Sequence, residues 1–199
     1  MSRKKGEDNS RLVAVVMAVV IVISVATLIY VGLPHEGNVA QNASQGGGEE
    51  KVVLTLTYGN ESFNYTLDEL MKMDSFTGSG RYIKKSGTIV GPNNYTGVRI
   101  SMLLKDVPNL PENFTIEAIA SDGYTVNYTY DEVKGYVAVY NESGNETGVG
   151  SLTMIIAYKE NGELLGESTG GPLRVAFVDD GAISSSSLWI RSVTAILIK

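Results

Sequence analysis

Gly170-Gly171-Pro172-Leu173-Arg174-Val175 is a turn that leads into a predicted β-strand over residues 173–178. Glycine and proline interrupt regular structure, and the short apolar run after them is typical of a buried strand. The stretch is not a phosphate-binding loop, because it lacks the Lys-Ser/Thr ending and no helical pattern follows it. It therefore predicts sheet structure rather than a nucleotide site.

Hydrophobic periodicity predicts more strands than helices on both sides of this stretch. The pairs Gly59-Asn60 and Asn161-Gly162 are typical of β-hairpin turns. Residues 74–97 and 141–150 are rich in glycine or polar residues, so we expect mostly loop there. Many short strands with brief helices between them indicate an α+β or mostly β domain. The expected strands are 52–58, 63–65, 88–90, 114–120, 124–130, 152–158, 173–178 and 189–198, and the expected helices are 67–73, 99–106 and one turn after Thr129.

An uncharged run of 22 residues, Leu12 to Leu33, precedes this domain. At about 1.5 Å per residue in a helix it is long enough to span the hydrocarbon core of a membrane. Basic residues in the tail 1–11 place the N-terminus in the cytoplasm by the positive-inside rule. We therefore expect a cytoplasmic tail 1–11, an uncleaved signal anchor 12–33, a flexible stalk 34–50 and an extracytoplasmic domain 51–199 in the cell membrane. A signal peptide that is removed after export is the alternative.

Eight Asn-x-Ser/Thr sequons follow the apolar run, and none has proline in its middle position. Such a tripeptide is the acceptor for N-linked glycans on exported proteins, so this density indicates a glycosylated surface. Each asparagine lies in the stalk, in a predicted turn or loop, or on the polar face of a predicted strand. The sequons are at Asn42, Asn60, Asn64, Asn94, Asn113, Asn127, Asn141 and Asn145.

Charge and the missing cysteine restrict the function. The chain has a net charge of −6, and because the tail 1–11 contributes +2, the remainder carries −8. An acidic exported domain argues against nucleic acid and anionic lipid as partners. The chain has no cysteine, so neither a disulfide nor a thiolate ligand is available. Its one histidine, His35, lies in the stalk, and we predict no catalytic residue and no metal site.

Several short motifs follow one another in a recognisable order. They are Tyr95-Thr96-Gly97-Val98-Arg99-Ile100, Ala120-Ser121-Asp122-Gly123-Tyr124, Ala157-Tyr158 with Asn161-Gly162-Glu163-Leu164-Leu165, Gly170-Gly171-Pro172-Leu173-Arg174-Val175, Gly181 and Trp189. Over about residues 52–198 this order resembles the molybdopterin-binding domain of sulfite-oxidase-type oxidoreductases. The segment 87–92 resembles a shorter form found in archaeal surface proteins. The resemblance implies an α+β, sulfite-oxidase-like fold, mostly β with short helices, here preceded by one transmembrane helix.

The same resemblance implies molybdopterin as a cofactor. The implied contacts are Arg99, Asp122, Tyr124, Gly171 and Arg174. In the family a Cys thiolate binds molybdenum, a His precedes the Gly-x-Pro segment and a Lys precedes the final Trp. This chain has Thr169 and Leu188 at the last two places and no cysteine at all. Because no oxygen or nitrogen side chain replaces a soft thiolate, we expect no cofactor, no redox catalysis, and a ligand-binding or structural role at the cell surface.

Alternatives stay open at this point. One is a molybdopterin-dependent oxidoreductase or electron-transfer subunit whose metal has no Cys ligand, and another is a β-rich surface-layer or adhesion module. Arg99 could simply open a helix, and Arg174 could point outward from its strand into solvent. The basic loop with Arg81, Lys84 and Lys85 is either solvated or a contact for an anionic small ligand, and a surface protein is the other candidate partner.

Overall fold

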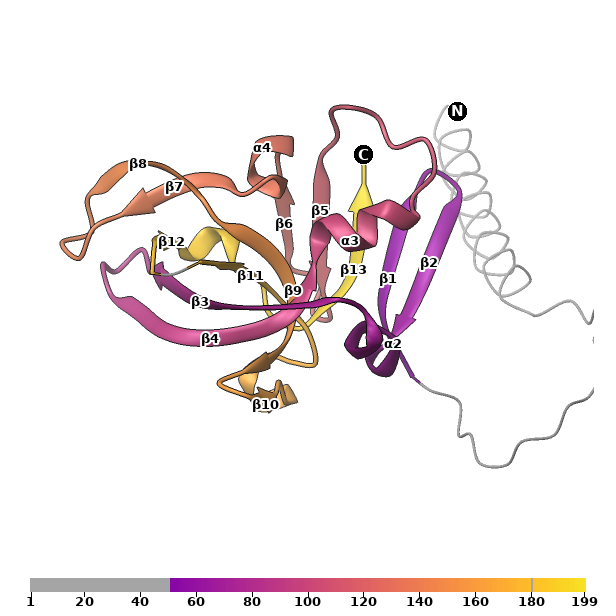
Figure 1. Ribbon diagram of the computed structural model, residues 1–199, viewed down its shortest axis with the longest axis horizontal. Helices are drawn as coiled ribbons and strands as arrows, with labels where there is room; N and C mark the ends of the chain where they lie inside the picture. The colour runs from indigo at the N-terminus through magenta and orange to yellow at the C-terminus, as the bar shows by residue number, and fades with distance from the viewer. Residues whose placement is uncertain (1–50, 180) are drawn as a thin grey trace, which may run out of the picture. The chain divides into compact units, whose positions relative to one another are not determined.

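The structure is a computed structural model, and it describes residues 51–179 and 181–199. Its strands form two sheets, and its helices are short (Figure 1), so the expected β-rich fold is confirmed. The predicted tail 1–11, anchor 12–33 and stalk 34–50, with His35 and Asn42, lie outside the described residues. Among the residues that are described, no helix combines the length and the apolar character needed to cross a membrane.

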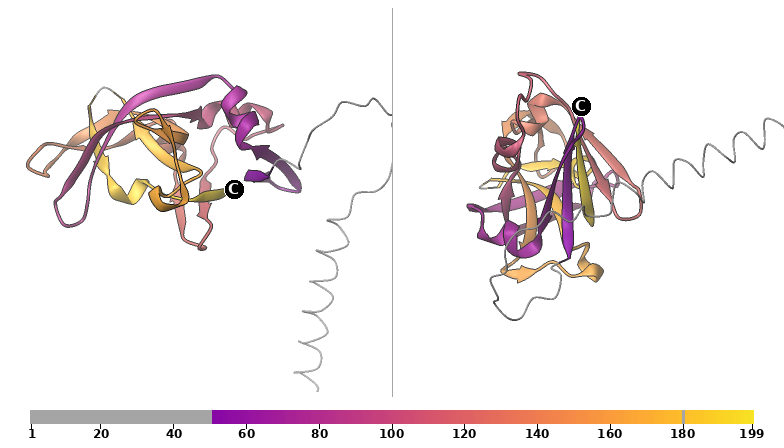
Figure 2. Two further views of the ribbon diagram at one scale, coloured as in Figure 1. Left: turned by 90° about the horizontal axis from the view of Figure 1, so that it is seen from below. Right: turned by 90° about the vertical axis from the view of Figure 1, so that its right-hand side faces the viewer.

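The first sheet joins the two ends of the domain. Its strand order is β2-β1-β13-β5-β6. The strands are β1 (Val52–Tyr58), β2 (Glu61–Thr66), β5 (Ile116–Ala120), β6 (Thr125–Tyr128) and β13 (Val193–Ile198). Strand β13 runs parallel to β1, and the two lie side by side (Figure 2). The predicted β1–β2 hairpin is confirmed, and Gly59 has the positive φ of 58° that its turn requires.

The second sheet has the order β10-β9-β4-β3-β12-β7-β8, and β11 also pairs with β9. The strands are β3 (Ser75–Ile83), β4 (Ile89–Arg99), β7 (Tyr136–Tyr140), β8 (Glu146–Ser151), β9 (Thr153–Glu160), β10 (Glu163–Leu164), β11 (Arg174–Val178) and β12 (Ile183–Ser185). The prediction of mostly loop at 74–97 was wrong, because this segment contains the β3–β4 hairpin, although the strand expected at 88–90 is part of β4. The loop predicted at 141–150 is confirmed only over 141–145, since β8 begins at Glu146. Glycine here permits close packing: a Cβ on Gly97 would lie 2.2 Å from the carbonyl oxygen of Ile156 on β9.

Short helices connect the strands. The α-helices are α2 (Leu67–Lys72), α3 (Ile100–Leu103) and α4 (Tyr130–Val133), and single 3₁₀ turns cover Leu104–Asp106, Glu167–Thr169 and Ser186–Leu188. A capping box opens α2, because the Thr66 hydroxyl accepts from the Glu69 amide at 3.2 Å while the Glu69 carboxylate accepts from the Thr66 amide at 2.7 Å. Thr129 and Glu132 form the same arrangement at α4. Both helix starts were predicted from the sequence.

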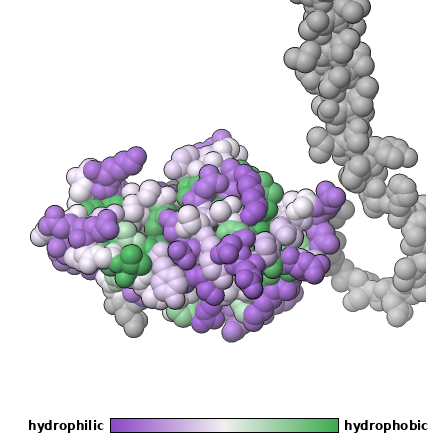
Figure 3. Space-filling view, turned by 90° about the horizontal axis from the view of Figure 1, so that it is seen from above, coloured by the Kyte–Doolittle hydropathy of each residue, from purple (hydrophilic) through white to green (hydrophobic). Residues whose placement is uncertain are grey.

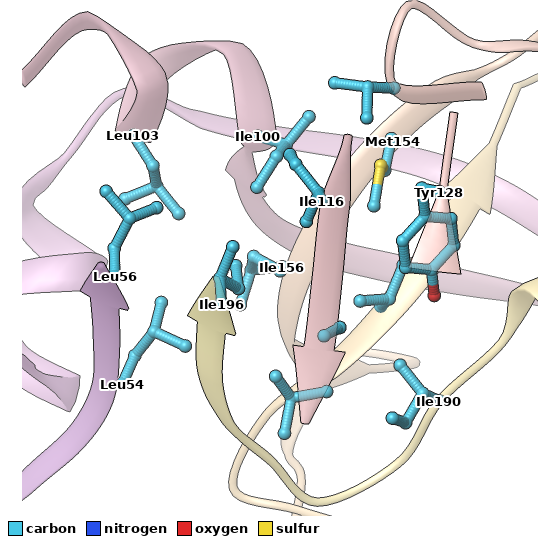
Figure 4. Packing of buried hydrophobic residues seen from close by; sticks show 14 of the residues in the cluster. Leu54, Leu56, Ile100, Leu103, Ile116, Tyr128, Met154, Ile156, Ile190 and Ile196 are labelled. Carbon is cyan, nitrogen blue, oxygen red and sulfur yellow. The ribbon is translucent and has the colours of Figure 1, made fainter. Parts of the chain in front are cut away.

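The main hydrophobic core contains side chains from both sheets and from α3 (Figure 4). Each fully buried Leu or Ile stabilises the fold by about 1.5–3 kcal/mol relative to an exposed one. On the face shown in Figure 3, hydrophilic residues are interspersed with smaller hydrophobic areas. Labelled members of the core are Leu54, Leu56, Ile100, Leu103, Ile116, Tyr128, Met154, Ile156, Ile190 and Ile196.

Candidate functional site

A cleft of about 380 Å³ opens beside Trp189, which is the only tryptophan of the chain. We call it the Trp189 cleft. The residues that carry its chemistry are Tyr82, Lys84, Asp122, Tyr124, Trp189 and Arg191. Its volume falls in the range of about 300–1,000 Å³ that is usual for small-molecule sites.

The indole of Trp189 is fixed from several sides. Its Nε1 donates to the Ser184 hydroxyl at 2.8 Å, and that hydroxyl donates to the carbonyl oxygen of Arg81 at 3.2 Å. Strand β12 runs parallel to β3 and sets Ser184 opposite Tyr82, whose ring centroid lies 4.9 Å from that of Trp189. The Tyr95 ring meets the indole edge-on at 5.2 Å. Hydrogen bonding and ring packing therefore hold the indole in one orientation.

Two cations lie in the same cleft. Lys84 follows β3, where its amide donates to the carbonyl of Thr88 at 2.9 Å, and its side chain is exposed. Arg191 is also exposed, and its aliphatic stem packs on Gly170, where a Cβ would lie 2.6 Å from the Arg191 Cδ. Within residues 51–179 and 181–199, neither cation has a carboxylate at ion-pair distance. Both side chains are exposed cations that line one cleft.

Asp122 and Tyr124 complete the Trp189 cleft. The Asp122 carboxylate accepts from the Tyr124 amide at 2.9 Å, which closes the turn between β5 and β6. The Tyr124 side chain is 58% exposed. These are the two predicted cofactor contacts that the structure brings together. Aromatic rings beside two cations and one carboxylate suit a planar anion better than a neutral or cationic molecule.

Arg174 lies in an internal network, so the reading of an outward, solvated side chain was wrong. The residue is 3% exposed, although β11 begins with it. Its Nη1 donates to the Tyr95 hydroxyl at 3.2 Å and lies 3.4 Å from Glu160 Oε2, and its Nη2 donates to the Thr169 carbonyl at 3.1 Å. The guanidinium also lies 5.4 Å from the centroid of the Tyr95 ring. Arg174 therefore supports Tyr95, and through it the indole of Trp189.

Glu160 accepts from the other partners in this network. Its Oε1 accepts from the Tyr95 hydroxyl at 2.7 Å and from Asn93 Nδ2 at 2.8 Å. Burial, together with the hydrogen bond to Glu160, raises the pKa of Tyr95 to about 12. The phenol is therefore neutral at physiological pH and acts as a structural donor rather than as an acid or base.

The remaining predicted contacts lie elsewhere. Arg99 packs over the Phe76 ring at 4.3 Å and lies 3.8 Å from Asp74, and it lines a separate hollow next to α3. Gly171 lines a larger cleft of about 540 Å³ beside Lys51 and Glu167. This second cleft contains hydroxyl groups but no aromatic ring, and its one cation is balanced by one carboxylate. Its composition does not select a charged ligand.

The residues present do not fit a molybdenum centre. No thiolate ligand is available in the chain, and the described part contains no group of three His, Cys, Asp or Glu side chains that could hold a metal ion. In β3, a Cβ on Gly80 would lie 2.6 Å from Trp189 Cη2 and 2.8 Å from Tyr95 Cδ2. The rings of Trp189 and Tyr95 thus leave no room for a metal-binding side chain at position 80.

Comparisons with known proteins support the fold. Neither a protein family nor a curated protein matches the sequence. Among solved structures, the chain is similar to the sulfane dehydrogenase SoxCD from Paracoccus pantotrophus, with 16% identity and a TM-score of 0.55. The match covers 77% of this chain and 39% of the SoxCD chain. This likeness shows the fold alone. It agrees with the β-rich architecture expected from the motifs, and the activity of SoxCD does not follow from it.

Several residues of the cleft were not predicted as site residues. Trp189 was noted only as a motif landmark, and Tyr82 and Arg191 were not singled out. Their partners lie far away in the sequence, as with Tyr82 and Trp189, so periodicity could not bring them together. The one local signal was the basic loop at 81–85, which contains Lys84.

Proposed function

We propose that this chain is a membrane-anchored, glycosylated, extracytoplasmic domain that binds a small planar anion in the Trp189 cleft without molybdenum redox chemistry. The observation that carries the proposal is the placement of Lys84 and Arg191 beside the rings of Trp189 and Tyr82. A planar anion would stack on the rings and receive charge-assisted hydrogen bonds from the cations. The chemical class is an aromatic carboxylate or a phosphate ester of a ring compound.

The sequence supports the proposed location. The uncharged run 12–33 has the length of a membrane span, and basic residues precede it. The seven sequon asparagines in the described residues are all exposed, which glycosylation requires. Extraction tests the anchor directly: the full chain should stay with membranes in an alkaline wash and dissolve in detergent. Release by the wash would contradict the anchor.

Tryptophan fluorescence tests the ligand class, because Trp189 is the one tryptophan in the full chain. The detergent-solubilised protein is titrated with adenosine monophosphate, with benzoate and with inorganic phosphate, and calorimetry repeats each titration. We expect the first two to change the fluorescence saturably and inorganic phosphate to bind more weakly, because it has no ring to stack. Equal or absent responses to all three would refute a site for planar anions.

Matched variants locate the site. Lys84→Met and Arg191→Met should each weaken binding by about tenfold or more, because a hydrogen bond to a charged group contributes about 1.5–3 kcal/mol. Lys85→Met is the control, since Lys85 is exposed on the same hairpin but does not line the Trp189 cleft. Equal losses in all three variants would indicate a general charge effect and no defined site.

A further inference from the structure

The two sheets leave several strand edges open. Strands β2 and β6 end the first sheet, and β10 and β8 end the second. Strand β10 has only two residues, so it offers little edge to pair with. Strand β11 pairs with β9 and with no other strand in the sheet order, but it is buried over its whole length. An open edge presents unpaired backbone N–H and C=O groups to any other strand. The edges at risk of pairing with another molecule are thus β2, β6 and β8.

These three strands lack most of the usual protection. Their sequences, Glu-Ser-Phe-Asn-Tyr-Thr, Thr-Val-Asn-Tyr and Glu-Thr-Gly-Val-Gly-Ser, contain neither lysine nor proline. Lysine and other charged side chains, proline, bulges and short strand length are the features that commonly keep edges apart. Here β2 and β8 each carry a single charge, at their first residues Glu61 and Glu146, and β6 has four residues. Strand β8 has a bulge opposite Val139/Tyr140, yet its Val149 is 71% exposed. The amino acids by themselves leave these edges open to a second copy of the chain.

The sequons are concentrated at the same edges. Asn64 lies within β2 and Asn60 in its turn, Asn127 lies within β6, and Asn145 immediately precedes β8. All of them are exposed. In Figure 1, β2 and the β7–β8 hairpin lie at opposite ends of the domain, so the edge sequons are not clustered in one place. Each edge at risk has a sequon of its own.

Other sequons are placed differently and serve as a comparison. Asn94 lies on β4, which is paired on both sides, by β9 and β3. Asn113 lies in the loop before β5 and on no strand. These two positions are as exposed as the edge positions but protect no edge.

We propose that N-linked glycans at Asn64, Asn127 and Asn145 act as edge guards, which keep a second copy of this chain from pairing with β2, β6 or β8. Pairing requires two strands to approach to about 4.8 Å. A hydrated oligosaccharide attached at the edge excludes a strand at that distance. Anchored copies share one membrane plane and meet often, which makes the protection necessary. This inference rests on the glycosylation proposed above.

The test removes edge glycans and keeps the fold. Thr66 and Thr129, the last residues of two edge sequons, are helix N-caps, so the asparagines are changed instead. The variant is Asn64→Gln/Asn127→Gln/Asn145→Gln in the full chain from a glycosylating host, and the control is Asn42→Gln/Asn94→Gln/Asn113→Gln. Asn64→Gln also removes the exposed hydrogen bond that Thr55 donates to Asn64 at 2.8 Å. Each variant removes three sequons, so the loss of carbohydrate is matched.

Sedimentation velocity in detergent reports assembly, and thermal unfolding reports the fold. We expect the edge variant to rise in mass by about twofold or more, as for a two-fold dimer, while the control stays at the wild-type mass. Enzymatic removal of glycans from folded wild-type protein should produce the same assembly. If the edge variant does not fold, this treatment replaces it as the test, and an unchanged mass after glycan removal contradicts the proposal. Equal masses for edge variant and control would overturn the proposal.

Mass spectrometry of wild-type glycopeptides shows which asparagines carry glycans, and so distinguishes failure of the edge role from failure of the proposed glycosylation. If Asn64, Asn127 and Asn145 carry glycans but the protein does not assemble after their removal, the edge role is overturned and the proposed glycosylation stays intact. Unmodified asparagines at these three positions would overturn the edge role and weaken the proposed glycosylation as well. Binding of planar anions to the Trp189 cleft is independent of both results.

Discussion

The indole Nε1 of Trp189 donates a hydrogen bond to the hydroxyl of Ser184 at 2.8 Å. Ser184 lies on β12 and donates to the backbone of Arg81 on β3 at 3.2 Å, so that the indole is tied to the second sheet. The Tyr95 ring and the Arg174 network support it from the other side. A ligand that stacks on this indole would therefore meet a surface that is ordered before binding, which lowers the entropic cost of binding.

Gly80→Ala should disturb the Trp189 cleft, because the new Cβ would lie 2.6 Å from Trp189 Cη2. We expect a loss of about 1–3 kcal/mol in the free energy of unfolding, as for overpacking in a core, together with a shifted tryptophan emission. Gly166→Ala is the matched control, since a Cβ there meets nothing within 4 Å. Unchanged emission and stability in Gly80→Ala would show that the indole is not fixed as described.

Arg174→Met should destabilise the fold, because it leaves Glu160 and Tyr95 without their cationic partner. Removing one member of a buried ion pair costs about 3 kcal/mol or more. Arg99→Met should cost less than about 1 kcal/mol, because its pair with Asp74 is long, at 3.8 Å, and largely exposed. Urea unfolding of both variants gives the comparison. If Arg174→Met lowers the free energy of unfolding by no more than Arg99→Met does, Arg174 does not stabilise the fold through this network.

Stability should fall at alkaline pH in part through Tyr95. Burial raises the pKa of this phenol from 10.0 to about 12, so its contribution to stability is complete below pH 10 and is lost as the pH rises toward about 12. Burial also raises the pKa values of Tyr65 and Tyr128, which contribute in the same direction. Tyr95→Phe should therefore give a shallower, but not flat, decline of the unfolding free energy over this range. A decline as steep as that of the wild type would rule out a shifted Tyr95.

Thr129→Ala should lower stability by about 1 kcal/mol, because the Thr129 hydroxyl caps α4 and completes its capping box. Thr129→Ser keeps both the cap and the Asn127 sequon, so it should retain nearly the full stability. Producing both variants in a host that does not glycosylate separates the cap from the glycan. Equal stability of the two variants there would mean that the cap contributes nothing.

Local features were predictable from the sequence because their causes are local. The β1–β2 turn at Gly59-Asn60 and the capping boxes at Thr66 and Thr129 depend on residues within a few positions of each other. The β3–β4 hairpin was not predicted, because glycine commonly interrupts regular structure. Gly80 and Gly97 instead leave room for rings and a strand from other parts of the chain. Those neighbours cannot be read from the local sequence.

The site was less predictable than the fold for the same reason. Asp122 and Tyr124 are neighbours in one turn, and both were identified. Arg174 was expected either at a cofactor or in solvent, but Tyr95 and Glu160, which lie 79 and 14 residues away in sequence, hold it inside. Trp189 and Tyr82 meet only because β12 returns beside β3. Tertiary pairing therefore decides which residues share the cleft.

Elemental analysis of the full chain purified from its own host shows whether the folded protein contains molybdenum. We expect a molybdenum-to-protein ratio near zero, because the chain has no cysteine and the rings of Trp189 and Tyr95 fill the space next to Gly80 on β3. A ratio near one, in protein that retains its fold, would contradict it.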